Sequence, residues 1–250
     1  MPDQIDLRTS ALLLDIDGTL LDIAPSPHEV KVPPALLATL ADLRQQTAGA
    51  LAFVSGRSVS DIDAIFTPLQ LTAVGGHGAE IRWLLDGKVT QDGVAPLAEP
   101  LRARIRSIGD KPGIIVEDKG YSIALHYRRA PEKRQAIHDA VEAIRLELPP
   151  NYVEVLTGKA MVEIKKAGFN KGTAIRELMR HPPFAGRRPI FVGDDVTDEA
   201  AFAVMPELGG LAMSVGRIAP GAARRFEAPA DVRRWLARVC KGAEPARPAK

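Results

Sequence analysis

The sequence predicts an α/β protein in which a doubly wound parallel sheet is interrupted by an inserted α+β module. Two observations lead to this prediction. Short apolar runs that end in glycine or aspartate alternate with helix-like stretches near both ends of the chain, which is typical of parallel β-α-β units. Between residues 80 and 165 the texture changes, because the strands there look paired and antiparallel around turn residues such as Asp86-Gly87.

The first part of the chain has the pattern β-α-β-α-β. Residues 11–14 form a continuous apolar run, which is typical of a strand buried in a parallel sheet. Residues 35–46 predict a helix, because Leu36, Leu40 and Leu43 fall on one face. The other elements predicted here are strands at residues 50–54 and 71–74 and a helix at residues 59–66.

The middle of the chain predicts a β-β-α-β-β-α-β-β module. Its first hairpin is indicated by Asp86-Gly87, a dipeptide that favours tight turns between antiparallel strands. The predicted strands cover residues 81–85, 88–91, 113–117, 121–128, 152–156 and 161–165, and the predicted helices cover residues 97–108 and 132–148.

The parallel pattern resumes after this module. A helix is predicted at residues 171–180, a strand at 189–192, a helix at 199–204 and a strand at 211–215. A last helix presents Val232, Trp235, Leu236 and Val239 on one face. We therefore expect a core from residues 1–79 and 166–240, an inserted domain from residues 80–165, and a disordered tail at residues 241–250, which are rich in proline, alanine and charge.

Composition narrows the class of partner. The 250 residues are 46% hydrophobic and 26% charged, with a formal net charge of +2, so neither nucleic acid nor a membrane surface is indicated as a partner. The single cysteine, Cys240, cannot form an intramolecular disulfide, which suits a reducing compartment. No export core precedes Ser10, and no apolar run approaches the roughly 20 residues that span a bilayer. We expect a cytoplasmic protein.

Two carboxylates follow the first strand, at Asp15 and Asp17. Like charges at this spacing repel each other unless a cation holds them, and a divalent metal is the usual solution. Gly18 allows a sharp bend, and Thr19 adds a hydroxyl. Taken alone, the same residues could form an ordinary aspartate-rich turn.

Further polar groups follow the other predicted parallel strands, where open α/β sheets place their chemistry, and Lys171 stands at the start of a predicted helix. Phosphoryl transfer needs a nucleophile, a charge-neutralising metal and donors around the phosphate oxygens. Each of these groups also has a simpler explanation, as a turn serine, a solvated lysine or an aspartate-rich helix cap. The joint presence of all the groups at strand ends favours catalysis. The groups concerned are Ser55, Lys171, Asp194, Asp195 and Asp198.

These motifs, in this order, resemble the haloacid dehalogenase (HAD) superfamily of phosphatases. The resemblance implies a HAD-like doubly wound (Rossmannoid) parallel-sheet core with an inserted α+β cap domain that closes over the active site. It also implies that Asp15 is the nucleophile and Asp17 the general acid/base. Magnesium would be held by the Asp15 carboxylate, the Asp17 backbone carbonyl and Asp194, phosphate would be bound by Ser55 and Lys171, and Asp195 and Asp198 would be nearby supporting contacts.

Within this superfamily, the segments 55–58, 76–80, 116–120, 124–128, 162–165 and 193–199 resemble the trehalose-6-phosphate phosphatase family. The resemblance covers residues 11–215 and departs from the family at Lys166, where proline is frequent. It implies sugar-binding roles for Glu117, Lys119 and Glu163, for which an exposed salt bridge is the alternative. We also expect substrate contacts from Gly56, Arg57 and His77, although His77 could simply order its loop and Arg57 could pair with a carboxylate, whereas His126 and Arg128 would brace a strand.

We therefore expect a magnesium-dependent enzyme that hydrolyses trehalose 6-phosphate through an aspartyl phosphate, with a small-molecule sugar phosphate as its partner. The sequence does not specify oligomeric state, and we expect a monomer. Three alternatives stay open: a phosphatase for sucrose phosphate or a glycosylglycerate phosphate, a sugar phosphomutase, and a non-catalytic sugar-phosphate sensor.

Overall fold

The computed structural model places two compact units along the chain. The core unit comprises Met1–Thr90 and Asn170–Lys250, and the inserted unit comprises Gln91–Phe169. The structure describes residues 5–24, 29–83, 87, 89–90, 94–158 and 160–242.

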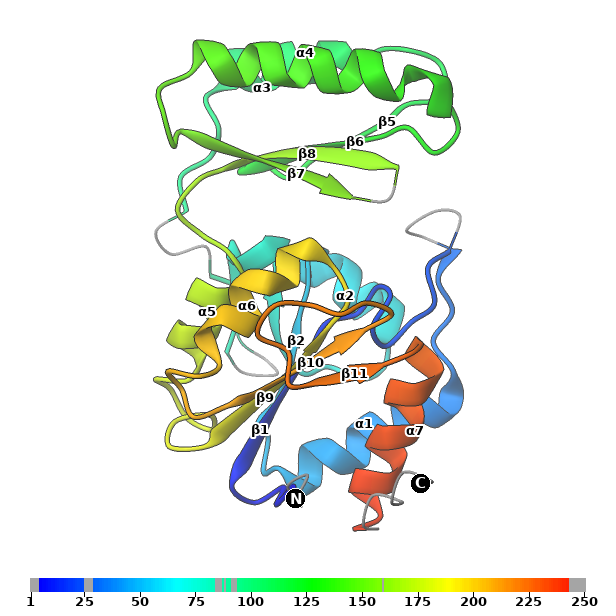
Figure 1. Ribbon diagram of the computed structural model, residues 1–250, viewed down its shortest axis with the longest axis vertical. Helices are drawn as coiled ribbons and strands as arrows, with labels where there is room; N and C mark the ends of the chain where they lie inside the picture. The colour runs from blue at the N-terminus through cyan, green and yellow to red at the C-terminus, as the bar shows by residue number, and fades with distance from the viewer. Residues whose placement is uncertain are drawn as a thin grey trace. The chain divides into compact units, whose positions relative to one another are not determined.

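The core unit is built on one seven-stranded sheet of order β11-β10-β9-β1-β2-β3-β4 (Figure 1). All neighbouring strands are parallel except β3 and β4. Strands β2, β3 and β4 follow one another on one side of β1, and strands β9, β10 and β11 follow one another on its other side. The direction of the strand order therefore reverses between β1 and β9. The strands are β1 Ser10–Leu14, β2 Leu51–Val54, β3 Thr72–Gly75, β4 Glu80–Arg82, β9 Arg188–Gly193, β10 Leu211–Val215 and β11 Arg224–Phe226.

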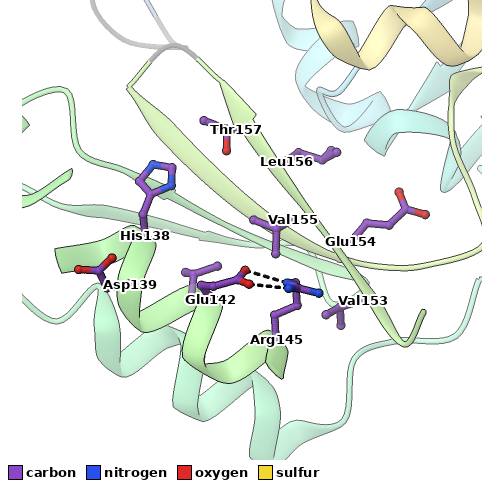
Figure 2. A pocket seen from close by; sticks show the side chains of 10 residues that line it. His138, Asp139, Glu142, Arg145, Val153, Glu154, Val155, Leu156 and Thr157 are labelled. Atoms are coloured by element: carbon purple, nitrogen blue, oxygen red, sulfur yellow. Dashed lines mark hydrogen bonds and ion pairs between the residues drawn. The ribbon is translucent and has the colours of Figure 1, made fainter. Parts of the chain in front are cut away.

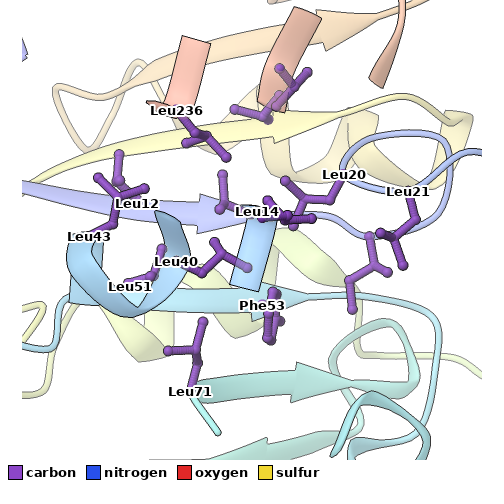
Figure 3. Packing of buried hydrophobic residues seen from close by; sticks show 14 of the residues in the cluster. Leu12, Leu14, Leu20, Leu21, Leu40, Leu43, Leu51, Phe53, Leu71 and Leu236 are labelled. Atoms are coloured by element: carbon purple, nitrogen blue, oxygen red, sulfur yellow. The ribbon is translucent and has the colours of Figure 1, made fainter. Parts of the chain in front are cut away.

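Helices cover both faces of this sheet. Leu12 and Leu14 of β1 belong to one buried cluster, packed with residues of α1, α2 and α7 (Figure 3), whereas Ala11 and Leu13 belong to a second cluster with residues of α5 and α6. The apolar run of β1 is continuous because both of its faces are buried. The helices are α1 Pro34–Gln46, α2 Val59–Phe66, α5 Lys171–Leu178, α6 Glu199–Val204 and α7 Pro229–Cys240.

The inserted unit is an antiparallel sheet of order β5-β6-β8-β7, with two helices on one face (Figure 1). Apolar residues of the helices and of the facing side of the sheet form its own buried cluster. The elements are α3 Glu99–Ile108, β5 Ile115–Asp118, β6 Ser122–His126, α4 Arg134–Glu147, β7 Val153–Gly158 and β8 Met161–Lys166.

A pocket of about 690 Å³ lies between α4 and β7 in this unit (Figure 2). Its wall includes Glu142 and Arg145, which pair with each other through two hydrogen bonds. None of the residues predicted to act in catalysis or substrate binding lines it. The pocket is therefore no candidate for the phosphatase site.

The structure corrects the predicted start of the inserted module. We expected a strand at residues 81–85 to belong to that module, but β4 pairs antiparallel with β3 and so extends the core sheet. Ile81 still pairs with Thr90, whereas Asp86 of the predicted turn lies outside the described residues. Alternating hydrophobicity identifies a strand but not the sheet edge that it joins.

Two other parts of the prediction concern the end of the chain. The strand β11, which pairs with β10, was not predicted, because Arg224 and Arg225 mask its short apolar pattern. Most of the tail expected to be disordered, residues 243–250, lies outside the described residues. Among the residues that the structure describes, no helix is both long and apolar enough to cross a membrane.

Candidate active site

Asp15 lies directly after β1, the strand beside which the order of the sheet reverses. Its backbone N–H donates to the carbonyl of Val192 at 3.0 Å, which continues the β1–β9 ladder by one residue. Its side chain is buried, and the hydroxyl of Thr19 donates to Oδ2 at 3.1 Å. The structure therefore places this carboxylate at the carboxyl end of the parallel strands, where open α/β sheets bind ligands.

Lys171 holds the other oxygen of Asp15. It is the first residue of α5, whose N-terminus is fixed by a capping box in which Asn170 accepts from the backbone N–H of Thr173 at 2.9 Å. The Lys171 Nζ donates to Asp15 Oδ1 at 2.8 Å and to Asp198 Oδ1 at 2.6 Å. The helix start thus delivers a buried cation between two buried carboxylates.

The protonation of this cluster is set by burial and by its mixed charges. Burial raises the pKa of Asp15 well above its ordinary value, and Asp198 and Asp194 act in the same direction, against the nearby ammonium of Lys171. Burial alone would lower the pKa of Lys171, but Asp15 and Asp198 outweigh it and raise that pKa. Lys171 is therefore a cation bonded to two carboxylates, and the carboxylate of Asp194 lies beside them.

The acid loop, residues 194–198 after β9, completes a site that fits a divalent cation. Carboxylate oxygens of Asp15, Asp194 and Asp198 lie within 4.8 Å of one another. Gly18 lies against Asp194 with a φ of +78°, and a Cβ at this position would stand 2.1 Å from Asp194 Oδ2. Oxygen ligands and an excess of negative charge suit a hard cation such as Mg²⁺.

Asp195 has a local role in the acid loop. It caps the short 3₁₀ helix Val196–Asp198, where its Oδ1 accepts from the Val196 N–H at 2.6 Å. Its own N–H donates to Asp198 Oδ2 at 2.9 Å. Because Asp198 also accepts from Lys171, these bonds connect the acid loop to the nucleophile candidate.

Asp17 is more exposed and pairs with Arg57. The guanidinium donates from Nε to Asp17 Oδ2 and from Nη2 to Oδ1, each at 2.6 Å. This bidentate geometry is the strong form of an arginine–carboxylate contact. It confirms the pairing with a carboxylate that the sequence left open for Arg57.

The residues predicted after β2 and β3 form one turn cluster. Ser55 Oγ accepts from the Arg57 N–H at 3.2 Å, and the Ser55 carbonyl accepts from the His77 N–H at 3.0 Å. A Cβ on Gly56 would lie 2.5 Å from the His77 ring, so a larger residue there would displace this ring. His77 itself has a φ of +57° within the 3₁₀ helix Gly76–Gly78. The motifs that follow β2 and β3 in the sequence are thus connected by hydrogen bonds in one turn cluster.

The candidate sugar-binding residues lie together in the inserted unit. Lys119 Nζ is 3.4 Å from Glu117 Oε1 and 3.7 Å from Glu163 Oε1, and His126 Nε2 is 3.1 Å from Glu117 Oε2. Burial would raise the pKa of Glu117, but the hydrogen bond with His126 and the charge of Lys119 outweigh it and lower that pKa. His126, which we expected only to brace its strand, therefore contacts Glu117, a candidate sugar-binding residue.

One residue at the core site was not predicted. Arg217 follows β10 and donates to the backbone carbonyls of Asp194 and Asp195, each at 3.0 Å. The only sequence signal was its place at the end of a strand of the parallel sheet, next to Gly216.

Comparisons with known proteins agree with this geometry. A probable trehalose-phosphate phosphatase of Sinorhizobium fredii is 42% identical over 216 residues, covering 86% of this chain and 81% of that protein. The trehalose-6-phosphate phosphatase of Escherichia coli K12 is 39% identical over 228 residues, covering 90% and 85%.

Solved structures agree at the level of fold. A trehalose-6-phosphate phosphatase related protein superposes with a TM-score of 0.70 at 26% identity, covering 92% of this chain and 97% of that one. A phosphatase of the HAD enzyme superfamily from Bacteroides thetaiotaomicron has a TM-score of 0.63 at 14% identity, covering 95% and 97%, which concerns the fold alone. The sequence profile of the trehalose-phosphatase family matches residues 13–226, and the chain belongs to this family.

Proposed function

We propose that this protein is a magnesium-dependent phosphatase that hydrolyses trehalose 6-phosphate to trehalose and phosphate. The observation that carries the reaction type is the Asp15 carboxylate, held by Thr19 and Lys171 beside the carboxylates of Asp194 and Asp198. The choice of sugar is supported by the relatives, which cover most of the chain and are named for this substrate.

The first step is attack on phosphorus by an oxygen of Asp15. A bond forms between Asp15 and phosphorus as the bond from phosphorus to the sugar oxygen breaks, which gives an aspartyl phosphate and releases trehalose. Lys171 and Thr19 hold the carboxylate in one orientation, so little reorganisation is needed before attack. Ser55 and Lys171 bind the phosphate oxygens.

Asp17 donates one proton and later accepts another. It protonates the departing sugar oxygen and then takes a proton from the water that attacks the aspartyl phosphate, as the bond from Asp15 to phosphorus breaks and phosphate is released. Both of its oxygens accept from Arg57 before substrate binds. Each oxygen keeps a second lone-pair site, so Asp17 can carry a proton while Arg57 holds its orientation.

Asp15, Asp194 and the backbone carbonyl of Asp17 would hold Mg²⁺. The bound cation would neutralise charge on the transferring phosphoryl group. The bonds of Asp198 to Lys171 and to the N–H of Asp195 connect the acid loop to α5, so we assign Asp198 to holding this loop together with Asp195.

Sugar recognition belongs to the cluster of Glu117, Lys119 and Glu163. These charged groups can donate to and accept from sugar hydroxyls, and charge-assisted hydrogen bonds of this kind are strong. Gly56, Arg57 and His77 form the second candidate set of substrate contacts, with Gly56 leaving space for the His77 ring.

A phosphate-release assay over a panel of sugar phosphates, with Mg²⁺ and with EDTA, tests the function. We expect trehalose 6-phosphate to be hydrolysed fastest and only with the metal. A preference for sucrose phosphate or a glycosylglycerate phosphate would overturn the substrate. A demand for a bisphosphate activator would indicate a mutase, and the absence of release from every sugar phosphate would indicate a sensor.

We also propose that the enzyme works as a monomer in the cytoplasm. The single cysteine supports a reducing compartment. Light scattering at the concentration of the assay and fractionation of the native cells test the two statements separately.

A further inference from the structure

Arg217 ties the acid loop to the next strand of the core sheet. Its Nε donates to the carbonyl of Asp194 and its Nη2 to the carbonyl of Asp195, each at 3.0 Å, while Nη2 also donates to Glu199 Oε1 at 2.7 Å. One planar guanidinium therefore bridges two consecutive peptide groups and the first residue of α6. Arginine suits this contact because its donors form a rigid fork.

Arg217 is itself held firmly. Its carbonyl accepts from the buried hydroxyl of Ser214 at 2.8 Å. The preceding residue, Gly216, turns the chain with a φ of +70°, and its N–H donates to the carbonyl of Phe226 in β11 at 2.9 Å. The guanidinium is thus presented by a turn that is bonded on both sides.

The acid loop is also held from its other end. Asp198 accepts from the N–H of Asp195 at 2.9 Å and from Nζ of Lys171 at 2.6 Å. Asp194 begins this loop, and its carboxylate lies within 4.8 Å of those of Asp15 and Asp198. The backbone of Asp194 is restrained on the side where Arg217 binds its carbonyl.

We propose that Arg217 is a positioning residue that sets the Asp194 carboxylate for the divalent cation. This inference rests on the proposed function, because it concerns the metal of that reaction. Groups that orient metal ligands through hydrogen bonds commonly change metal affinity by about 10- to 100-fold when they are removed. In this role Arg217 acts through the peptide groups of the acid loop and not by contact with the reacting atoms.

The charge of Arg217 and its positioning role predict opposite changes in metal affinity when its guanidinium is removed. A guanidinium beside an acidic cluster repels a second cation, so charge alone predicts that Mn²⁺ binds more tightly once Arg217 is neutralised. Loss of positioning predicts weaker binding instead. A direct measurement of metal affinity therefore separates the two without any reference to turnover.

The test is Mn²⁺ binding to the full chain, followed by electron paramagnetic resonance of the free ion. We expect the Mn²⁺ Kd of Arg217→Gln to rise by about 10- to 100-fold. Arg217→Lys keeps the charge but lacks the rigid fork of donors, so its Kd should lie between those of wild type and Arg217→Gln. Arg188→Gln is the matched control, because Arg188 Nε donates to the Gly209 carbonyl at 3.2 Å at the opposite end of β9, and its Kd should not change.

A folding measurement and the comparison with wild type make the outcome decisive. Circular dichroism establishes that each variant is folded, and Arg217→Lys provides the binding comparison if Arg217→Gln is not. An unchanged or lower Kd in both variants, beside normal binding in wild type, overturns the positioning role alone. No Mn²⁺ binding by wild type overturns the metal-dependent function together with this proposal.

Discussion

The core unit and the inserted unit each contain a cluster of paired charges, and the two differ in how tightly the charges are held. In the core, Lys171 lies 2.8 Å from Asp15 and 2.6 Å from Asp198, and all three side chains are at most 6% exposed. In the inserted unit, Lys119 lies 3.4 Å from Glu117 and 3.7 Å from Glu163, and Glu117 is 35% exposed.

This difference matches the two proposed tasks. A nucleophile gains from one fixed orientation, and short buried bonds provide it. A sugar site must exchange its internal contacts for hydroxyls, and ion pairs at 3.4 and 3.7 Å are longer than ordinary hydrogen bonds, so ligand groups can replace them. The comparison predicts that core variants affect every substrate, whereas variants of the inserted unit affect the sugar phosphate alone.

The largest effect is expected from Asp15→Asn. The amide cannot attack phosphorus, so turnover should fall by at least about 10⁴-fold, the scale on which enzymes respond to loss of a member of a catalytic unit. The fold should remain, because Lys171 keeps Asp198 as its partner. Phosphate release from trehalose 6-phosphate and from p-nitrophenyl phosphate, together with the melting temperature, measures both statements. Near-normal activity on either ester would contradict the mechanism.

The second effect is a loss of stability in Lys171→Met. Removing the cation leaves buried carboxylates without their counter-ion, which costs about 3–5 kcal/mol of unfolding free energy in comparable sites. The pKa of Asp15 is already raised above 3.8 in the folded state, and this variant raises it further. The folded state then binds more protons than the unfolded state, so the loss should grow as pH rises.

Urea unfolding in EDTA at pH 5 and pH 7.5 measures this loss. We expect a larger difference between wild type and Lys171→Met at pH 7.5. An equal loss at both values would mean that Lys171 stabilises the site by packing instead of by its charge. Added Mg²⁺ should restore part of the stability, because it neutralises the same carboxylates.

The core cluster was predictable for physical reasons that the inserted unit lacks. Strands buried on both faces leave continuous apolar runs, and the residue after each run falls at one edge of a parallel sheet. Asp15, Ser55 and Asp194 could therefore be placed together without knowledge of any contact, and Lys171, at the start of a predicted helix, could be joined to them by the chemistry that phosphoryl transfer needs. Arg217 could not, because its bonds depend on how the turn after β10 folds against the acid loop.

In the inserted unit, side-chain contacts depend on strand register. His126 pairs with Ile115 across the β5–β6 ladder, and this register puts its ring diagonally opposite Glu117. The sequence contains no signal for that register, so the contact between His126 and Glu117 was missed. The candidate roles of Glu117, Lys119 and Glu163 came from family resemblance, and variants of this unit test them directly.

The third effect concerns Glu163→Gln, which keeps the shape of the side chain and removes its charge. A hydrogen bond to a charged group contributes about 1.5–3 kcal/mol, so kcat/KM for trehalose 6-phosphate should fall by about 10- to 100-fold. Hydrolysis of p-nitrophenyl phosphate, which has no sugar, should change by less than about threefold. Equal losses on the two esters would contradict a sugar-binding role.

A carboxylate on the same face of this sheet provides the matched control for that variant. Glu154 of β7 pairs with Lys165 at 2.8 Å, and its neighbour on that face, Leu156, lies opposite Glu163. Glu154→Gln removes the same charge from the same sheet without touching the candidate sugar ligands. Its kcat/KM for trehalose 6-phosphate should stay close to that of wild type.

The smallest effect is expected from His126→Gln. His126 helps to keep the pKa of Glu117 below 4.5, so its loss should move that pKa upward. The ionised Glu117 stabilises the fold above about pH 4.5, and this stability disappears as pH falls through the folded-state pKa, which lies higher in the variant. Wild type should therefore remain more stable than the variant down to a lower pH, and NMR titration of the Glu117 carboxyl measures the shift in its pKa.

The same variant should have a small effect on catalysis. Because a partly exposed contact contributes only about 0.5–1 kcal/mol, KM should rise by about two- to fivefold with kcat nearly unchanged. A fall in kcat at constant KM would instead place His126 in the chemistry and remove the distinction between the two clusters.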